Sequence, residues 1–187
     1  SKYRVVNAGV DVNSKADDFA PYIRGKKNDE LYFTSSREGV LGKNTNHITG
    51  QLFTDIFLIK KSEDKKRRKK SSSKTISPPS WDVNSVSNVE LGLDELVNLK
   101  NSEEGVVSFN KRGNRMFFTR AIFQKNKYQG RRIYSATFRG KKFRDVSMEV
   151  IPIDTLVDVH GPSVSPDEKS LFFSAEIPGG MGGTDIY

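Results

Sequence analysis

The chain has 187 residues, which is long enough for one domain with a hydrophobic core or for part of a larger one. Apolar residues make up 35% of it and the mean hydropathy is −0.59, and no stretch approaches the roughly 18 apolar residues of a membrane-spanning helix. The lack of cysteine excludes disulfides, thiol catalysis and cysteine-ligated zinc. The formal net charge of +8 suits an anionic partner, and its distribution along the chain matters more than its sum.

Short β-prone runs separated by polar turns follow one another along the chain, and they predict an all-β fold. We expect strands over residues 3–6, 10–12, 19–23, 31–36, 52–59, 81–86, 106–109, 116–119, 132–138 and 143–150. Residues 37–50 and 120–130 are expected to form loops. Residues 91–99 fit either one helical turn or an irregular edge segment.

The last stretch, residues 162–187, shows the pattern most clearly as strand, turn, strand, glycine loop and the start of a third strand. Ser165–Lys169 predicts a turn, because proline presets φ and aspartate can bond its own backbone. Leu171–Ser174 has the aromatic content of a strand buried on both faces. Gly179–Gly183 predicts a tight loop and not a phosphate loop, because it lacks the Lys-Ser/Thr pair and leads into a strand.

Two motifs recur three times along the chain. An aromatic core at Leu31–Thr34, Met116–Thr119 and Leu171–Ser174 is followed, after a loop, by Asp55–Phe57, Arg132–Tyr134 and Asp185–Tyr187. Phe118 and Phe173 are 55 residues apart. Phe33 and Phe118 are 85 apart, and subtracting the 19-residue loop 62–80 and 8 extra residues ahead of Ile56 leaves 58. A period of about 50 residues with four short strands per unit is typical of β-propeller blades.

The sequence resembles the WD-like β-propeller repeats of the Pro-Asp type, and its longer repeat resembles those of periplasmic OmpA-family proteins of Bacteroidetes-type bacteria. The resemblance covers nearly the whole chain. In the third unit it rests on Ser165, Pro166, Asp167, Leu171, Phe172, Phe173, Gly179, Gly180, Gly182, Gly183, Asp185, Ile186 and Tyr187. Trp81 and Asn101-Ser102 match in the second unit, and Asn13-Ser14, Pro21 and Asp55-Ile56-Phe57 match in the first. The departures are Asn110–Gly113 at the second turn, Arg132 in place of Asp, and Glu168 in place of the turn glycine.

This resemblance implies one partial β-propeller over residues 1–187, with four antiparallel strands per blade. Residues 1–18 would supply the outer strand of a preceding blade and a connector. The first blade would span 19–104 with a basic loop insertion at 60–80, the second 105–160, and an incomplete third 161–187. Because propellers close with about four to eight blades, the remaining blades are expected from the rest of the same polypeptide.

The residues that could carry chemistry lack the patterns that chemistry needs. His47 and His160 are the only histidines, and neither accompanies a G-x-S-x-G elbow or an H-E-x-x-H helix. The carboxylates Asp17-Asp18 and Glu103-Glu104 fall on connectors, where turn bonding is expected, and they lack the spacing of a calcium loop. We therefore expect a protein that is not an enzyme, with no catalytic residue, no cofactor and no metal site.

One run of like charges stands outside the repeat, at residues 60–70. The candidate contact with an anionic partner consists of Lys65, Lys66, Arg67, Arg68, Lys69 and Lys70. No aromatic residue is interleaved for base stacking, so no nucleic acid is expected. A solvated loop and a contact with an anionic envelope surface or protein both stay open.

By resemblance, the expected function is a non-enzymatic protein-interaction scaffold that is periplasmic and associated with the outer membrane, in a machine such as the type IX secretion (gliding) apparatus. Its partners would be envelope proteins, either outer-membrane or secretion-machine components. Peptidoglycan would be contacted only through a domain that is not in this sequence. Two alternatives stay open: a substrate-filtering propeller beside a hydrolase domain outside this chain, and a Tol-like propeller that binds a peptidoglycan-associated lipoprotein.

Overall fold

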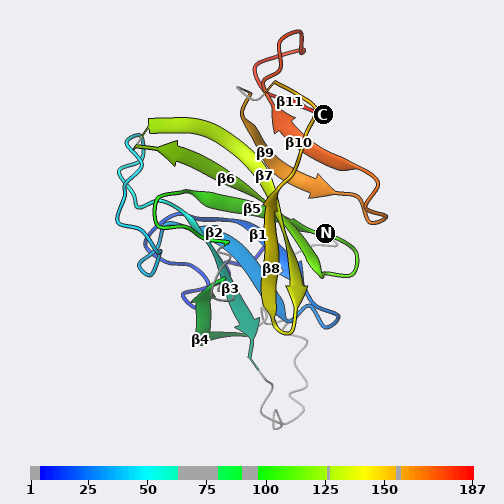
Figure 1. Cartoon of the computed structure of the whole chain (residues 1–187). Helices are drawn as coiled ribbons and strands as arrows, with labels where there is room; N and C mark the ends of the chain where they lie inside the picture. Colours follow the sequence, from blue (N-terminus) through cyan, green and yellow to red (C-terminus); the bar gives the residue numbers. More distant parts are fainter. Residues whose placement is uncertain (1–4, 63–79, 90–96, 126, 155–156) are drawn as a thin grey trace, which may run out of the picture.

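The computed structural model describes residues 5–62, 80–89, 97–125, 127–154 and 157–187, and over these residues the protein is all-β, with no helix (Figure 1). Three antiparallel sheets follow one another along the chain. The first has the order β1 (Asp18–Arg24), β2 (Glu30–Ser35), β3 (Asp55–Lys61) and β4 (Trp81–Asn88). The second has the order β5 (Glu104–Phe109), β6 (Arg115–Gln124), β7 (Lys127–Arg139) and β8 (Lys142–Met148). The third pairs β10 (Leu171–Ala175) with β9 (Val159–Val164) on one side and β11 (Asp185–Ile186) on the other.

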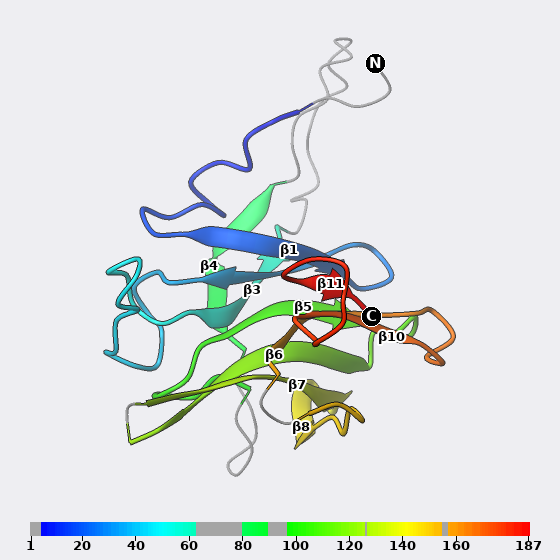
Figure 2. The same cartoon turned by 90° about the horizontal axis from the view of Figure 1, so that it is seen from above.

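The sheets stack face to face, with the second between the other two. Strand β5 contacts β1, β2 and β3 of the first sheet, and β9 contacts β5, β6 and β7 of the second. Figure 2 shows the first sheet lying along one side of the second. The first strand of each later sheet therefore lies against the preceding sheet.

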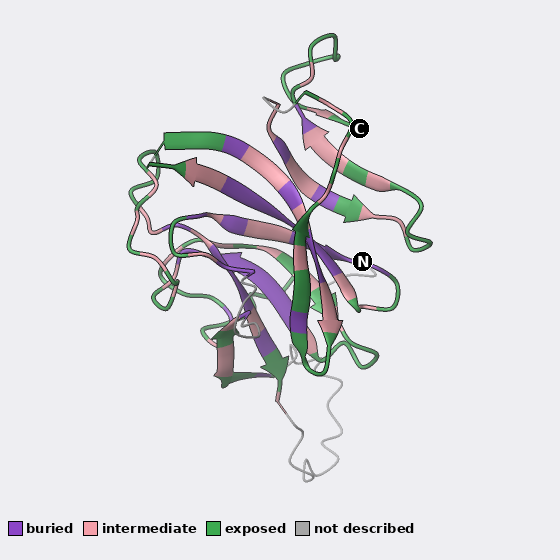
Figure 3. Cartoon of the chain, viewed as in Figure 1, coloured by how far each residue is buried: buried purple, intermediate pink, exposed green. Residues whose placement is uncertain are grey.

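Alternating side chains of the aromatic strands fill the two interfaces between sheets. Tyr32 of β2 lies 4.9 Å from the Phe109 ring, and Phe118 of β6 joins the same cluster. The neighbouring Phe117 points to the other face of β6 and packs with Ile133 and Val159. Because successive residues of a strand face opposite ways, one strand serves both interfaces. Figure 3 shows the resulting buried bands on the central strands.

A β-bulge recurs at the same place in all three sheets. The third residues of β1, β5 and β9, which are Ala20, Val106 and Gly161, have φ values of 51°, 47° and 64°. The strand register shifts at each of these points. Positive φ is uncommon for alanine and rare for a β-branched residue, so the surrounding structure must hold it in place.

The bulge connects each later sheet to the preceding one. The Val106 N–H donates to Thr34 Oγ1 at 3.0 Å, and the Gly161 N–H donates to Thr119 Oγ1 at 3.1 Å. Thr34 and Thr119 occupy the same position in β2 and β6. The bulge frees one amide from its own ladder, and that amide satisfies its hydrogen bond in the preceding sheet.

Three expectations about the strands are wrong. Residues 10–12 form a turn closed on the Gly9 carbonyl, and the described residues 5–17 contain no strand; Val12 instead packs beside Phe33 on the outer side of the first sheet. Residues 120–130 form a hairpin extension of β6 and β7 and not a loop. The strand at Leu171–Ser174 is not buried on both faces, because Phe172 is 50% exposed on the side that no described sheet covers.

The turns and most of the strands are as expected. Ser165 Oγ and the Lys169 N–H both bond Asp167 Oδ1, and Glu168 adopts the positive φ that the glycine of the motif would favour. Residues 91–96 of the ambiguous segment and 65–70 of the basic run lie outside the described residues. None of the described segments is a helix with the length and apolar character to cross a bilayer.

Candidate interaction cleft

One end of the stacked sheets collects the long connections. The β2–β3 connection (36–54), the tip of the β6–β7 hairpin and the connector at 97–103 meet there, and Figure 2 shows the β2–β3 connection beside the hairpin tip. Tight turns such as 110–114 and 140–141 occupy the other end. The β3–β4 connection also leaves from that other end, where the Ser62 N–H donates to the Ser80 carbonyl at 2.9 Å. The sequence candidates Lys65–Lys70 belong to this connection and lie outside the described residues.

A cleft of about 650 Å³ opens at the first of these ends. Three separate parts of the chain line it. They are the β2–β3 connection, Glu103, and the outer part of the β6–β7 hairpin around Phe123, Tyr128 and Arg131, which we call the arm. Its lining residues are Lys43, Asn44, Thr45, Asn46, His47, Ile48, Phe53, Glu103, Phe123, Tyr128 and Arg131. This volume falls within the roughly 300–1,000 Å³ of ligand-binding pockets.

Aromatic rings form one wall of the cleft. Phe53 stacks on Phe123 with ring centroids 4.9 Å apart, and Tyr128 meets Phe123 edge-on at 5.7 Å. Phe123 and Tyr128 are direct cross-strand partners in the hairpin, so the pairing of β6 with β7 places the two rings together. Phe53 is buried whereas Tyr128 is 44% exposed, and the wall therefore runs from the interior to solvent.

Charged and polar groups line the cleft beside these rings. Arg131 lies 3.8 Å from Glu103 and 3.7 Å from Asp158, and its guanidinium lies over the Tyr128 ring at 5.5 Å. Asn46 Nδ2 donates to Glu103 Oε1 at 2.9 Å, which ties the β2–β3 connection to the connector. The Tyr128 hydroxyl donates to Asp158, and burial together with this bond raises the Tyr128 pKa above its usual range. Tyr128 therefore remains a neutral phenol at physiological pH.

A second cavity of about 470 Å³ continues from the first and shares Asn46, Glu103 and Arg131 with it. It reaches Thr119 and His160, beside the hydrogen bond that joins the second and third sheets. His47 lines the first cavity and His160 the second, so the two histidines lie at different cavities along one groove. The described residues contain no group of three or more His, Asp or Glu side chains placed to hold a metal ion.

The paired carboxylates Glu103 and Glu104 have different environments. Glu103 faces the cleft, whereas Glu104 is buried and forms an ion pair with Arg120 at 2.9 Å. Burial raises the pKa of Glu104, and the Arg120 charge opposes that rise. Arg120 also donates to the Val97 carbonyl at 2.7 Å, and Glu104 accepts from the Leu99 N–H at 3.2 Å. This ion pair therefore holds the connector, on which Glu103 lies, against the second sheet.

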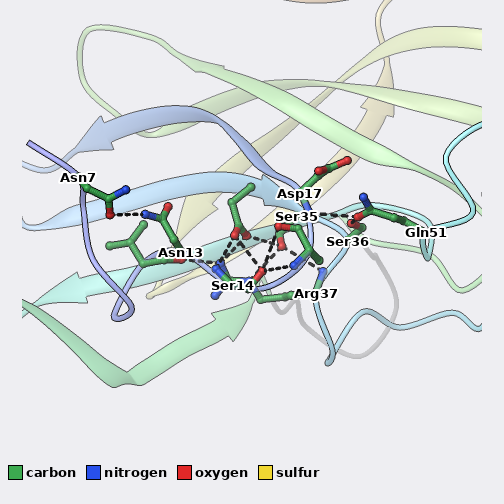
Figure 4. Close-up of polar contacts among 11 residues, drawn as sticks. Asn7, Asn13, Ser14, Asp17, Ser35, Ser36, Arg37 and Gln51 are labelled. Carbon is green, nitrogen blue, oxygen red and sulfur yellow. Dashed lines mark hydrogen bonds and ion pairs between the residues drawn. The ribbon is translucent and has the colours of Figure 1, made fainter. Parts of the chain in front are cut away.

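The acid at the equivalent position of the first sheet also forms an ion pair, and Figure 4 shows its partner Arg37 close to Ser14 and Ser35. Asp18 begins β1 as Glu104 begins β5, and it pairs with Arg37 just after β2. Asp18 also accepts hydrogen bonds from Ser35 at 2.7 Å and from the Ser14 N–H at 2.6 Å. Burial opposes ionisation of Asp18, but the hydrogen bonds from Ser35, Arg37 and Ser14 hold its pKa below its ordinary value. Asp18 anchors a turn, as the sequence predicted for it, whereas the turn bonding expected at Glu103-Glu104 is replaced at Glu104 by burial in β5 and an ion pair with Arg120.

Asp55 and Asp185, which begin the repeated motifs Asp55–Phe57 and Asp185–Tyr187, have the same structural role. Asp55 accepts a hydrogen bond from the Leu41 N–H at 2.7 Å, and Asp185 accepts from the Met181 N–H at 2.7 Å. Each folds the preceding glycine-containing loop back onto its strand. The Gly179–Gly183 segment is thus a loop closed by Asp185 that leads into β11, as the sequence predicted.

Sequence reasoning missed the cleft because its walls come from distant segments. Phe53, Glu103 and Arg131 each looked like an ordinary strand or connector residue. The β-prone Ile122-Phe123 and Tyr128, placed around the polar residues 124–127, were the one signal that could have found the arm. No protein-family model matches this chain, and no curated protein matches it either.

Proposed function

We propose that the chain is part of a β-propeller and acts as a non-enzymatic scaffold for protein–protein interactions. The observation that carries this proposal is the repeated contact between sheets, from the Val106 N–H to Thr34 and from the Gly161 N–H to Thr119. Propeller blades are four-stranded antiparallel sheets arranged around an axis. Because equivalent atoms make this contact at both interfaces, it supports an arrangement in which each sheet is rotated from the preceding one by the same angle.

The scaffold role is supported by the contrast between the repeated strands and the unlike connections. The bulge and the aromatic core recur in every sheet, whereas the connections at the cleft end differ in length and composition. Rigid strands that present variable loops suit the docking of other proteins. The environment proposed for this scaffold, the periplasmic side of an outer-membrane machine such as the type IX secretion apparatus, rests on the sequence resemblance alone.

Cross-linking of the intact protein in its native cells, followed by purification and mass spectrometry, tests the scaffold role. We expect an envelope protein to be captured and to bind again when both proteins are purified. If no captured protein rebinds, the scaffold proposal is wrong. Recovery of the intact protein in the cytoplasmic fraction would contradict the envelope location. An experimental structure of the intact protein with no common axis relating its sheets would exclude the propeller.

A further inference from the structure

We propose that the cleft between the β2–β3 connection and the β6–β7 arm binds an acidic peptide segment that carries an aromatic side chain. This inference rests on the proposed scaffold function and specifies the chemistry of its partner. Phe53, Phe123 and Tyr128 would receive the aromatic side chain, and Arg131 would receive a carboxylate beside it.

The arm is an addition that stacking of the sheets does not require. Strands β2 and β10 end at Ser35 and Ala175, which pair with the first residues of β1 and β9. The equivalent residue of β6 is Arg120, which pairs with Glu104, yet β6 continues to Gln124. Over this extension β6 pairs with β7 alone among the described strands. An arm built on one sheet and used to complete a cleft is better explained by binding than by folding.

The aromatic wall is a preformed receptor for a ring. Phe53 and Phe123 are already stacked, and Tyr128 is held by its bond to Asp158. A ligand that stacks on the half-exposed Tyr128 ring therefore meets a surface whose rotamers are set in advance. Preorganisation of this kind lowers the entropic cost of binding, and aromatic side chains at such positions commonly dominate interface energies.

The charges of the cleft favour a carboxylate. Glu103 and Asp158 are both engaged, by Asn46 and by the Tyr128 hydroxyl respectively. The Arg131 guanidinium lies 3.8 Å from Glu103 and 3.7 Å from Asp158, which is beyond the roughly 2.7–3.2 Å of an N–H···O hydrogen bond. A ligand carboxylate can thus bond Arg131 more closely than the protein's own acids do. Lys43 lines the same cleft, and Lys125 and Lys127 are exposed at the tip of the arm.

The same charges disfavour a nucleic acid. A phosphate backbone carries a charge on every nucleotide and would pass close to Glu103, which lines the cleft, and to Asp158 beside Arg131. A peptide can place one carboxylate at Arg131 and neutral groups beside the two acids. Nucleic-acid binding is the nearest alternative to this proposal, and binding of single-stranded DNA is therefore the outcome that would favour that alternative over a peptide.

The test uses purified intact protein and fluorescein-labelled peptides, with binding followed by fluorescence anisotropy. The probe is a short peptide with one Phe flanked by Asp residues, compared with the same peptide carrying Ala for Phe, the same peptide carrying Lys for Asp, and an oligothymidine. We expect saturable binding of the Phe–Asp peptide only, weakened by added salt. Arg131→Gln should weaken it at least about tenfold, because a hydrogen bond to a charged group is lost.

Two variants make the result specific to the cleft. Arg112→Gln removes an exposed arginine from the turn at the opposite end, and it should leave binding unchanged. Tyr128→Ala should abolish binding while the unfolding temperature changes little, because this ring is 44% exposed. Equal affinity of wild type, Arg131→Gln and Tyr128→Ala would overturn the proposal, as would tighter binding of oligothymidine than of the peptide. If native cross-linking finds a partner that both variants still bind, the cleft assignment fails while the scaffold function stands.

Discussion

The backbone N–H of Val106 donates a 3.0 Å hydrogen bond to Thr34 Oγ1, across 72 residues of sequence and between two sheets. Thr34 is completely buried, and Val106 reaches it only because its φ of 47° turns the amide out of its own ladder. The cost of the unusual backbone conformation is offset by the hydrogen bond that satisfies this part-buried amide. The same arrangement recurs at Gly161 and Thr119, so this hydrogen bond joins both pairs of neighbouring sheets.

Replacing Thr34 by valine should destabilise the protein by about 1–3 kcal/mol. Valine has nearly the same shape, but it leaves the part-buried Val106 N–H without its acceptor. Urea unfolding at neutral pH measures the change in the free energy of unfolding. Thr184→Val is the matched control, because Thr184 is exposed in the glycine loop, and it should lie within about 0.5 kcal/mol of wild type. A loss as small for Thr34→Val would show that the bond between sheets contributes nothing.

Replacing Gly105 by alanine should also weaken the interface between the first two sheets. A Cβ at this position would lie 2.7 Å from Thr34 Cγ2, so one strand must shift at a cost of about 1–3 kcal/mol. Thermal unfolding followed by circular dichroism gives the effect as a lower midpoint. Adding Thr34→Ser removes the clashing methyl and keeps the hydroxyl, so the double variant should recover part of the loss. Gly183→Ala, where no atom lies within 4 Å, is the control and should be neutral.

Stability should fall as the pH rises from about 4 to about 6, and Asp55 should account for part of that fall. Burial raises the pKa of Asp55 from 3.8 to about 6, against the hydrogen bond from the Leu41 N–H. Between these two values the folded protein keeps a proton that the unfolded chain has released, so raising the pH favours unfolding. This contribution to the free energy of unfolding is on the order of 3 kcal/mol; it is present in full below pH 3.8 and is lost above pH 6.

Unfolding free energies measured across this pH range test the assignment to Asp55. Asp55→Asn keeps an acceptor for the Leu41 N–H and cannot titrate, so its stability should depend less on pH than that of the wild type. Glu104 remains in both proteins as a second buried acid, and because the Asp55 charge helps to raise its pKa, the difference in slope reports Asp55 together with this coupling. Identical slopes for the two proteins would show that Asp55 titrates at its ordinary pKa in the folded state.

The local patterns predicted most of the strands but missed the features that join them. Turn chemistry at Ser165–Lys169 and aromatic alternation at Leu31–Ser36 act over a few residues, so they can be recognised in one segment at a time. The bulges have no common residue type, since Ala20, Val106 and Gly161 occupy the same position. The ion pair of Glu104 with Arg120 and the cleft around Arg131 depend on which strands become neighbours.

Sequence alone determined that this chain forms short antiparallel strands in a repeating order, because strand and turn preferences arise from neighbouring residues. The tertiary structure alone decided that Glu104 is buried while Glu103 faces a cleft, and that Phe53 meets Phe123. Two adjacent glutamates, or two aromatic residues 70 positions apart, carry no local sign of these environments. Burial and charge pairing are properties of the stacked sheets, and they exist only once the second sheet has packed against the first.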